Sequence, residues 1–120
     1  MYIIIGDRIE EVVKTYHELV GRPVLVPLYS LGYNQCRYGY HSEEALREVF
    51  EKAQETKFPM EVLWTDIDYM DRYIDFSIDK PRYPDFAKFV DETLHVNNVH
   101  FVPIIDAGVS ANRTDDPIFF

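Results

Sequence analysis

Several features that define other protein classes are scarce or missing in this 120-residue sequence. Its one cysteine, Cys36, has no partner for an internal disulfide, so the redox compartment stays undetermined. No apolar run reaches the roughly 20 residues that a transmembrane helix needs. Basic residues are also few, with 12 Lys and Arg against 21 Asp and Glu. The resulting net charge of −9 argues against nucleic acid and anionic membranes as partners.

The residues that are abundant indicate a folded domain with a modest core. Hydrophobic residues make up 47% of the chain and aromatic residues 15%, which argues against disorder. The aromatic residues exceed what the core of so short a chain needs. Such an excess lines sites for carbohydrates or other ring-bearing ligands, or fills interfaces with partners.

One stretch, Met60–Met70, combines a strand with acids. Its apolar run Val62–Trp64 is typical of a buried strand, and Asp66 and Asp68 follow it at once. Acids at the carboxyl end of such a strand stand where α/β sheets bind their ligands. The alternative is that both acids cap the next turn or bond its backbone amides.

Helical periodicity predicts three helices. The first begins at Asp7, which forms a capping box with Glu10, and ends at Gly21. The second is capped by Ser42, and the third begins near Pro84. The predicted buried faces of the second and third helices consist of Ala45, Leu46, Val49, Phe50 and Ala53, and of Phe86, Phe89, Val90 and Leu94.

Short β-type runs are expected between these helices. A lead-in strand is predicted at Tyr2–Ile5, and three more at Leu31–Cys36, around Val62–Trp64 and at Val99–Ile105. Pro103 makes the last of them irregular. This alternation indicates an α/β fold with right-handed crossovers and a parallel sheet. Because three strands cannot close a barrel, the chain looks like part of a larger fold.

The three main strands each end in groups that could contact a ligand. Arg37 and Tyr40 follow the first strand, Asp66 and Asp68 the second, and Asp106 the third. If the strands are adjacent and parallel, these groups gather on one rim and suit a neutral polyhydroxylated ligand. The alternative is that Arg37 pairs with one of the acids and Tyr40 packs.

The acids also permit a metal hypothesis. Asp66-Ile67-Asp68 matches the D-x-D element that binds a divalent cation and a nucleotide diphosphate in many glycosyltransferases. The four histidines show no metal-ligand spacing, and Cys36 is expected to be a buried structural residue. We assign no metal ligand and no cofactor from the sequence.

Three longer motifs carry a more specific signal. The stretches LGYNQCRYGY (31–40), WTDIDYMDRYIDF (64–76) and VPIIDAGVS (102–110) resemble glycoside hydrolase family 31, in the family's order and spacing. The similarity is to α-glucosidases of the lysosomal acid, maltase-glucoamylase and sucrase-isomaltase type. Residues 2–23 also resemble the segment that enters their catalytic barrel, so the resemblance covers nearly the whole chain.

The resemblance implies an architecture and a set of roles. Residues 24–120 correspond to the first three strands of a (β/α)8 TIM barrel, and residues 1–23 to a strand and helix leading in from a β-sandwich domain. It implies a retaining mechanism on a terminal α-linked glucose. The substrate-binding residues would be Asp66, Ile67, Tyr40 and Ile104, and the supporting residues Asp106, Asp68 and Arg37.

The departures from the family's pattern concern catalysis. The family's nucleophile lies in a W-x-D-M-N-E-type motif, which is absent here, as is the acid/base aspartate. The family's D-P-A-I-S appears as Asp106-Ala107-Gly108-Val109-Ser110. We therefore expect a fragment of a retaining α-glucosidase that grips an α-glucoside oligosaccharide, has no catalytic residue and is inactive alone.

Two other functions stay open on the sequence. One is a sugar-binding or interaction module that self-associates through open barrel edges, and the other is a metal-dependent glycosyltransferase using Asp66 and Asp68. If the chain follows the family, it belongs in the lysosome or secretory pathway, although its first residues do not resemble a signal peptide.

Overall fold

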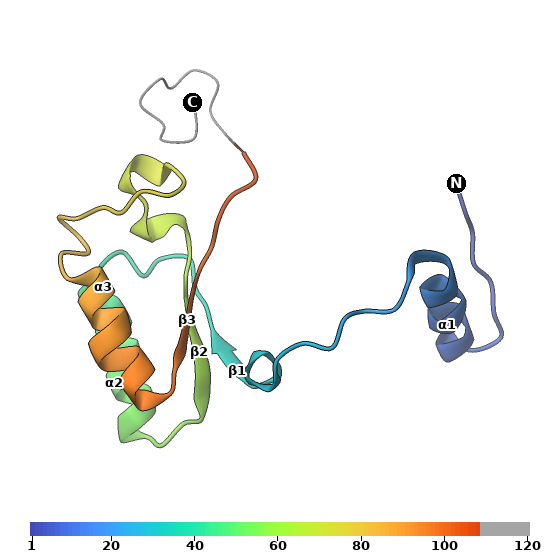
Figure 1. The fold of residues 1–120 in the computed structure, drawn as a ribbon, viewed down its shortest axis with the longest axis horizontal. Coiled ribbons are helices and arrows are strands. Elements are labelled where there is room, and N and C mark those ends of the chain that lie inside the picture. Colours follow the sequence, from blue (N-terminus) through green and yellow to red (C-terminus); the bar gives the residue numbers. More distant parts are fainter. Residues whose placement is uncertain (109–120) are drawn as a thin grey trace.

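The computed structural model describes residues 1–108, in which two helical segments cover one face of a three-stranded sheet. A further helix, α1, stands apart from the sheet at the end of an extended connection (Figure 1). The radius of gyration is 19.2 Å, against about 14 Å for a compact chain of this length. Within residues 1–108 no helix is long and apolar enough to cross a membrane.

The sheet confirms the predicted parallel arrangement. Its strands β1 (Tyr33–Gln35), β2 (Met60–Thr65) and β3 (His100–Pro103) lie in the order β1-β2-β3, and both pairs are parallel. β1 is shorter than predicted because residues Leu28–Leu31 form a 3₁₀ turn. β3 ends at Pro103, which has no amide hydrogen, and the Ile104 amide then donates to the Thr65 carbonyl at 3.1 Å.

The second predicted helix is confirmed as α2, Glu43–Glu55. The hydroxyl of Ser42 accepts a hydrogen bond from the Ala45 amide at 3.2 Å, which satisfies one of the free amides of the first turn. Leu46, Phe50 and Ala53 are buried as predicted. Ala45 and Val49 are partly buried and pack against the same core.

The third helical segment changes its winding along its length. A short α-helix, α3 (Phe86–Phe89), passes into a π-helical turn (Val90–Leu94) and then a 3₁₀ turn (His95–Asn97). Because a π turn spaces equivalent positions five residues apart, Phe89 and Leu94 both face the core. The predicted apolar face is therefore present, with Val90 only partly buried.

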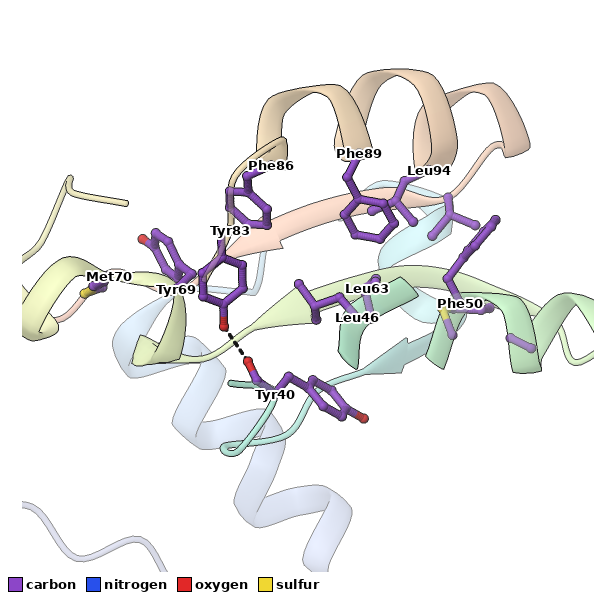
Figure 2. Close-up of a cluster of buried hydrophobic side chains, with 13 residues drawn as sticks. Tyr40, Leu46, Phe50, Leu63, Tyr69, Met70, Tyr83, Phe86, Phe89 and Leu94 are labelled. Atoms are coloured by element: carbon purple, nitrogen blue, oxygen red, sulfur yellow. Dashed lines mark hydrogen bonds between the residues drawn. The ribbon is translucent and has the colours of Figure 1, made fainter. Parts of the chain in front are cut away.

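The hydrophobic core lies between the sheet and these two helical segments (Figure 2). The Tyr83 hydroxyl crosses it to donate a hydrogen bond to the Tyr40 carbonyl oxygen. Edge-to-face and stacked rings around Phe86 fill the end near the strand termini. The buried cluster consists of Tyr40, Leu46, Phe50, Ala53, Met60, Leu63, Tyr69, Met70, Tyr83, Phe86, Phe89, Leu94 and Val99.

The amino-terminal segment differs from the prediction in two ways. Residues Tyr2–Ile5 form no strand, because no strand of the described chain lies beside them to supply hydrogen-bond partners. Helix α1 (Ile9–Val20) is present and ends at Gly21 as predicted, but its N-cap residue is Arg8 and no side chain caps it. No residue of α1 is buried, so its apolar stripe has no partner within residues 1–108.

Candidate functional site at the carboxyl ends of the strands

The predicted site residues follow three parallel strands and therefore converge on one edge of the sheet. The loop after β1 runs through Arg37–His41, the loop after β2 begins at Asp66, and the loop after β3 contains Ile104 and Asp106. Hydrogen bonds between these loops hold the edge together. Val109 and Ser110, the last two residues of the stretch that corresponds to the family's D-P-A-I-S, lie outside the described residues.

Asp66 stands directly after β2 and is half-buried. Its Oδ1 accepts a hydrogen bond from the Ile67 amide at 2.8 Å and caps the 3₁₀ helix η2 (Ile67–Tyr69). Its Oδ2 accepts no hydrogen bond from residues 1–108. A carboxylate oxygen accepts up to two hydrogen bonds, so Asp66 caps a turn and still has acceptor capacity for a ligand hydroxyl.

Asp68 joins two loops and has its oxygens occupied. It is 1% exposed, its Oδ2 accepts the Gly39 amide at 2.9 Å, and its Oδ1 lies 2.7 Å from Nδ1 of His41. These bonds cross-link the loop after β1 to the loop after β2. The alternative in which the acids bond backbone amides is therefore observed for both Asp66 and Asp68.

The contact of His41 with Asp68 is one that sequence reasoning missed. Nothing in the local pattern around His41 points to Asp68, because their contact depends on how β1 and β2 pair. Residues adjacent in a parallel sheet but far apart in sequence give no periodic signal.

Tyr40 packs in the core, as one of the two sequence alternatives proposed. It is 8% exposed, and its hydroxyl accepts a hydrogen bond from Gln35 Nε2 at 2.7 Å. Its ring belongs to the cluster between sheet and helices (Figure 2). This position gives Tyr40 a packing role and leaves its ring away from the solvent-facing rim.

Tyr38, two residues earlier, is the aromatic residue exposed beside the acids, with 58% of its surface accessible. A side-chain hydrogen bond with Tyr73 is the main cause that raises the pKa of the Tyr38 phenol, and the charges of Asp68 and Asp66 add to it. Tyr38 and Tyr40 both lie in the sequence motif of residues 31–40. Only the alternation of buried and exposed positions along the loop could have shown which of the two faces solvent.

Ile67 and Ile104 form the apolar part of the rim. Both are partly buried and pack against the core cluster. The Ile104 carbonyl accepts a hydrogen bond from the Tyr69 hydroxyl at 2.9 Å, which ties the loop after β3 to η2. Burial, and then the charge of Asp75, raise the pKa of the Tyr69 phenol, so this donor stays protonated.

Asp106 and Arg37 are both exposed. The Asp106 amide donates to Oδ1 of the buried Asp75 at 3.0 Å, so Asp75 holds the loop after β3. Arg37 forms no ion pair with a described residue, so the alternative in which it pairs with a rim acid is not seen in residues 1–108. Sequence reasoning did not single out Asp75.

Cys36 is exposed, which corrects the prediction of a buried structural cysteine. The reason is its place at the end of the short strand β1, just before the loop leaves the sheet. Partial desolvation and the nearby Asp66 charge raise the pKa of its thiol, which disfavours the nucleophilic thiolate. Across the part of the chain that the structure describes, no cluster of three or more His, Cys, Asp or Glu could hold a metal ion.

Comparison with known proteins agrees with this geometry. The family model of the glycosyl hydrolases family 31 TIM-barrel domain matches residues 23–119. The chain belongs to this family. It is 44% identical to glucoamylase 1 of Schwanniomyces occidentalis over 97% of its own length, and 44% identical to a probable α-glucosidase of Oryza sativa over 94%. The family assignment from the three sequence motifs is thus confirmed.

A solved structure shows the same arrangement of elements. The glucosidase II α subunit, in a form bound to DNJ, matches 95% of the chain with a TM-score of 0.81 and 31% identity. The chain spans 13% of the length of each of the two curated relatives and 12% of that solved chain. The three parallel strands are therefore part of a family 31 TIM-barrel domain.

Proposed function

We propose that this chain supplies the sugar-gripping side of an α-glucosidase barrel that acts on terminal α-linked glucose in oligosaccharides. The observation that supports this most is the family match together with the free Oδ2 of Asp66 on the rim. A carboxylate accepts hydrogen bonds from sugar hydroxyls, and Ile67 and Ile104 offer an apolar wall beside it. Residues 1–23 would join this part of the barrel to a preceding β-sandwich domain.

We expect this chain alone to cleave no glycosidic bond. In a retaining glycosidase one carboxylate attacks the anomeric carbon while a second acts as acid and then base. Asp68 is enclosed by its own hydrogen bonds, and Asp66 is assigned to the sugar hydroxyls, so neither takes these roles. The purified 120-residue chain should not turn over a chromogenic α-glucoside, and turnover that copurifies with it would contradict this.

Binding tests the assigned role of Asp66. Titration of the isotopically labelled chain with methyl α-D-glucopyranoside, followed by NMR, should shift resonances of the rim loops. Asp66→Ala should lower the affinity at least about tenfold, the equivalent of one buried charge-assisted hydrogen bond. Asp91→Ala, an exposed acid on the third helical segment, is the matched control and should bind as the wild type does. Equal affinity of all three proteins would refute the assignment.

A glycosyltransferase is the weaker candidate. A D-x-D pair binds its cation through free carboxylate oxygens, and those of Asp68 both contact protein groups. Manganese-dependent binding of a nucleotide sugar that Asp68→Ala abolishes would favour this function over the glucosidase.

We also propose that copies of the chain associate with one another through the open edges of the sheet. On their outer sides β1 and β3 pair with no described strand, and exposed parallel edges tend to pair with other chains. We expect purified chains to associate as their concentration rises, which sedimentation velocity measures directly. A stable monomer at high concentration would refute the hypothesis that the chain is an interaction module.

A further inference from the structure

Helix α1 carries an apolar stripe that has no partner within residues 1–108. Its large apolar residues recur at helical spacing and are between 46% and 76% exposed, namely Ile9, Val13, Tyr16, Leu19 and Val20. A helix of 12 residues is only marginally stable in water by itself, and packing of such a face supplies most of the stability of helices in proteins. The stripe is therefore a surface that needs a partner.

A groove of about 370 Å³ lies between β1 and the carboxyl-terminal half of α2, beside the outer edge of the sheet. Two of its lining residues, Tyr33 and Phe58, meet edge to face with 4.7 Å between their ring centres, and both remain nearly half exposed. Among the described residues that line the groove, Lys52 alone is charged. The rest of the lining is largely apolar and includes Tyr40, Val49, Ala53 and Met60.

The groove and α1 match in polarity and in charge. An apolar helix face laid into an apolar groove is a recurring mode of recognition between proteins. Helix α1 contains three glutamates and one lysine, whereas the groove contributes the cation of Lys52. Lys52 pairs with Glu55 at 3.1 Å, but both side chains are exposed and such pairs contribute little. Its ammonium can therefore exchange this partner for a glutamate of α1.

The connection between α1 and the sheet favours the groove of a second copy over that of the same chain. It contains Pro23 and Pro27, whose rings fix φ and hold the preceding Arg22 and Val26 extended. Pro27 has φ of −57° and ψ of 145°, a conformation of the polyproline type. The connection therefore acts as a spacer that keeps α1 away from the sheet of its own chain (Figure 1).

We propose that α1 of one copy docks in the groove of a second copy, which returns its own α1 to the first. This exchange is a domain swap that closes into a two-fold dimer with two identical contacts. Burial of the five exposed residues and the facing groove removes on the order of 500 Å² per contact, so two contacts reach about 1,000 Å², the lower limit for a specific interface. A single contact falls short of that limit, so the exchange is reciprocal. The inference goes beyond the proposed sugar site and does not depend on it.

Sedimentation velocity over a concentration series should show a monomer–dimer equilibrium for the wild type. Val13→Asp places a charge in the stripe and should raise the dissociation constant at least about tenfold, as should Phe58→Asp in the groove. The two substitutions lie on separate elements, so a local loss of structure at one of them cannot account for both effects. Val96→Asp is the matched control, because Val96 is 67% exposed on the third helical segment and lies outside both surfaces. It should dimerise as the wild type does.

A mixed sample identifies which α1 occupies the groove. Cys36, the single cysteine, is exposed and directly follows the groove residue Gln35, so a nitroxide attached to Cys36 marks the groove. A copy with this nitroxide and no isotopes is mixed with an isotopically labelled Cys36→Ser copy. The NMR resonances of α1 in the labelled copy should broaden, and Val13→Asp in that copy should abolish the broadening.

Three results would overturn the proposal. Dimers whose dissociation constant is unchanged in Val13→Asp and Phe58→Asp would come from the sheet edges and would refute the docking of α1. A wild type that stays monomeric at high concentration would refute both the docking and the edge pairing. Broadening of α1 in a copy that carries both labels, without broadening in the mixed sample, would place α1 in the groove of its own chain. The affinity for methyl α-D-glucopyranoside tests the sugar site separately from all three.

Discussion

Oδ1 of Asp68 lies 2.7 Å from Nδ1 of His41, although 27 residues separate them in the sequence. With the Gly39 amide on its other oxygen, the buried carboxylate joins the loops that follow two neighbouring strands. Asp66 and Tyr38 stand on these two loops, so their relative position depends on Asp68.

Asp68→Ala should therefore destabilise the chain by about 2–3 kcal/mol, because it removes two hydrogen bonds to a buried charged group. Urea unfolding followed through the fluorescence of Trp64, the single tryptophan, measures this change. Asp91→Ala is a matched control, since Asp91 also pairs with a histidine, His95, but at 3.3 Å on an exposed surface. The control should cost less than about 0.5 kcal/mol, and equal losses in both variants would contradict the anchoring role.

Alkaline pH should unfold the chain in part through Tyr83. Burial, and then the charge of Asp68, raise the pKa of its phenol well above the usual value. A raised folded-state pKa gives a contribution to stability that is fully present below about pH 10 and is lost as the pH rises, because the unfolded phenol ionises first. Tyr83→Phe should cost about 1–2 kcal/mol at neutral pH, since the Tyr40 carbonyl loses its donor.

The same variant should show a shallower loss of stability above about pH 10 than the wild type. Unfolding curves in urea, recorded at a series of alkaline pH values, measure the two slopes. Tyr2→Phe is the control, because Tyr2 is exposed and its substitution should leave the slope unchanged. Parallel pH profiles for the wild type and Tyr83→Phe would show that Tyr83 does not titrate differently on unfolding.

A side chain at Gly32 should be unfavourable, because the Glu61 side chain lies against this position at the irregular end of the β1–β2 pairing. A Cβ at position 32 would lie 2.2 Å from Cγ and 3.1 Å from Cβ of Glu61. Gly32→Ala should cost about 1–3 kcal/mol, as expected for forced repacking. Adding Glu61→Ala should recover part of this loss in urea unfolding, and Gly108→Ala, which meets no atom within 4 Å, should be near neutral. A near-neutral Gly32→Ala would refute the close packing.

The sequence was informative where structure is local. Ser42 and the apolar spacing behind it predicted α2, and the apolar run before Asp66 predicted β2, because capping and periodicity act within a few residues. Tyr2–Ile5 reads equally well as a strand, yet a strand forms only when another supplies its hydrogen bonds, and the described chain offers none.

The candidate site shows the same difference between local features, which the sequence predicts, and long-range contacts, which it does not. The position of Asp66 at the carboxyl end of β2 was predicted from its place after an apolar run, because such a run marks a buried strand. The contact of His41 with Asp68 and the exposure of Tyr38 in place of Tyr40 depend on strand pairing and on which face of the sheet the helices cover. Those are properties of the assembled sheet, and no spacing within one loop encodes them.

The junction of α2 with the third helical segment should depend on Glu43. Its Oε1 accepts hydrogen bonds from Arg47 at 2.6 and 3.0 Å, and its Oε2 accepts the Asp85 amide at 2.9 Å. The Arg47 guanidinium also lies 4.5 Å from the centre of the Phe89 ring, so it is fixed between the two elements. Glu43→Ala should cost about 2–3 kcal/mol, because the partly buried Arg47 guanidinium and the Asp85 amide both lose their buried acceptor.

Glu43→Gln separates the two contributions to this junction, since the amide oxygen still accepts from Asp85 while the charge opposite Arg47 is lost. It should destabilise the chain by about half as much as Glu43→Ala in urea unfolding. Glu55→Ala removes an acid that pairs with Lys52 at 3.1 Å on the exposed face of the same helix, and it should cost less than about 0.5 kcal/mol. If Glu43→Ala lowered the free energy of unfolding no more than Glu55→Ala, Glu43 would not hold this junction. Its stability would then come from the packing of Phe89 and Leu46, which are both fully buried in the core.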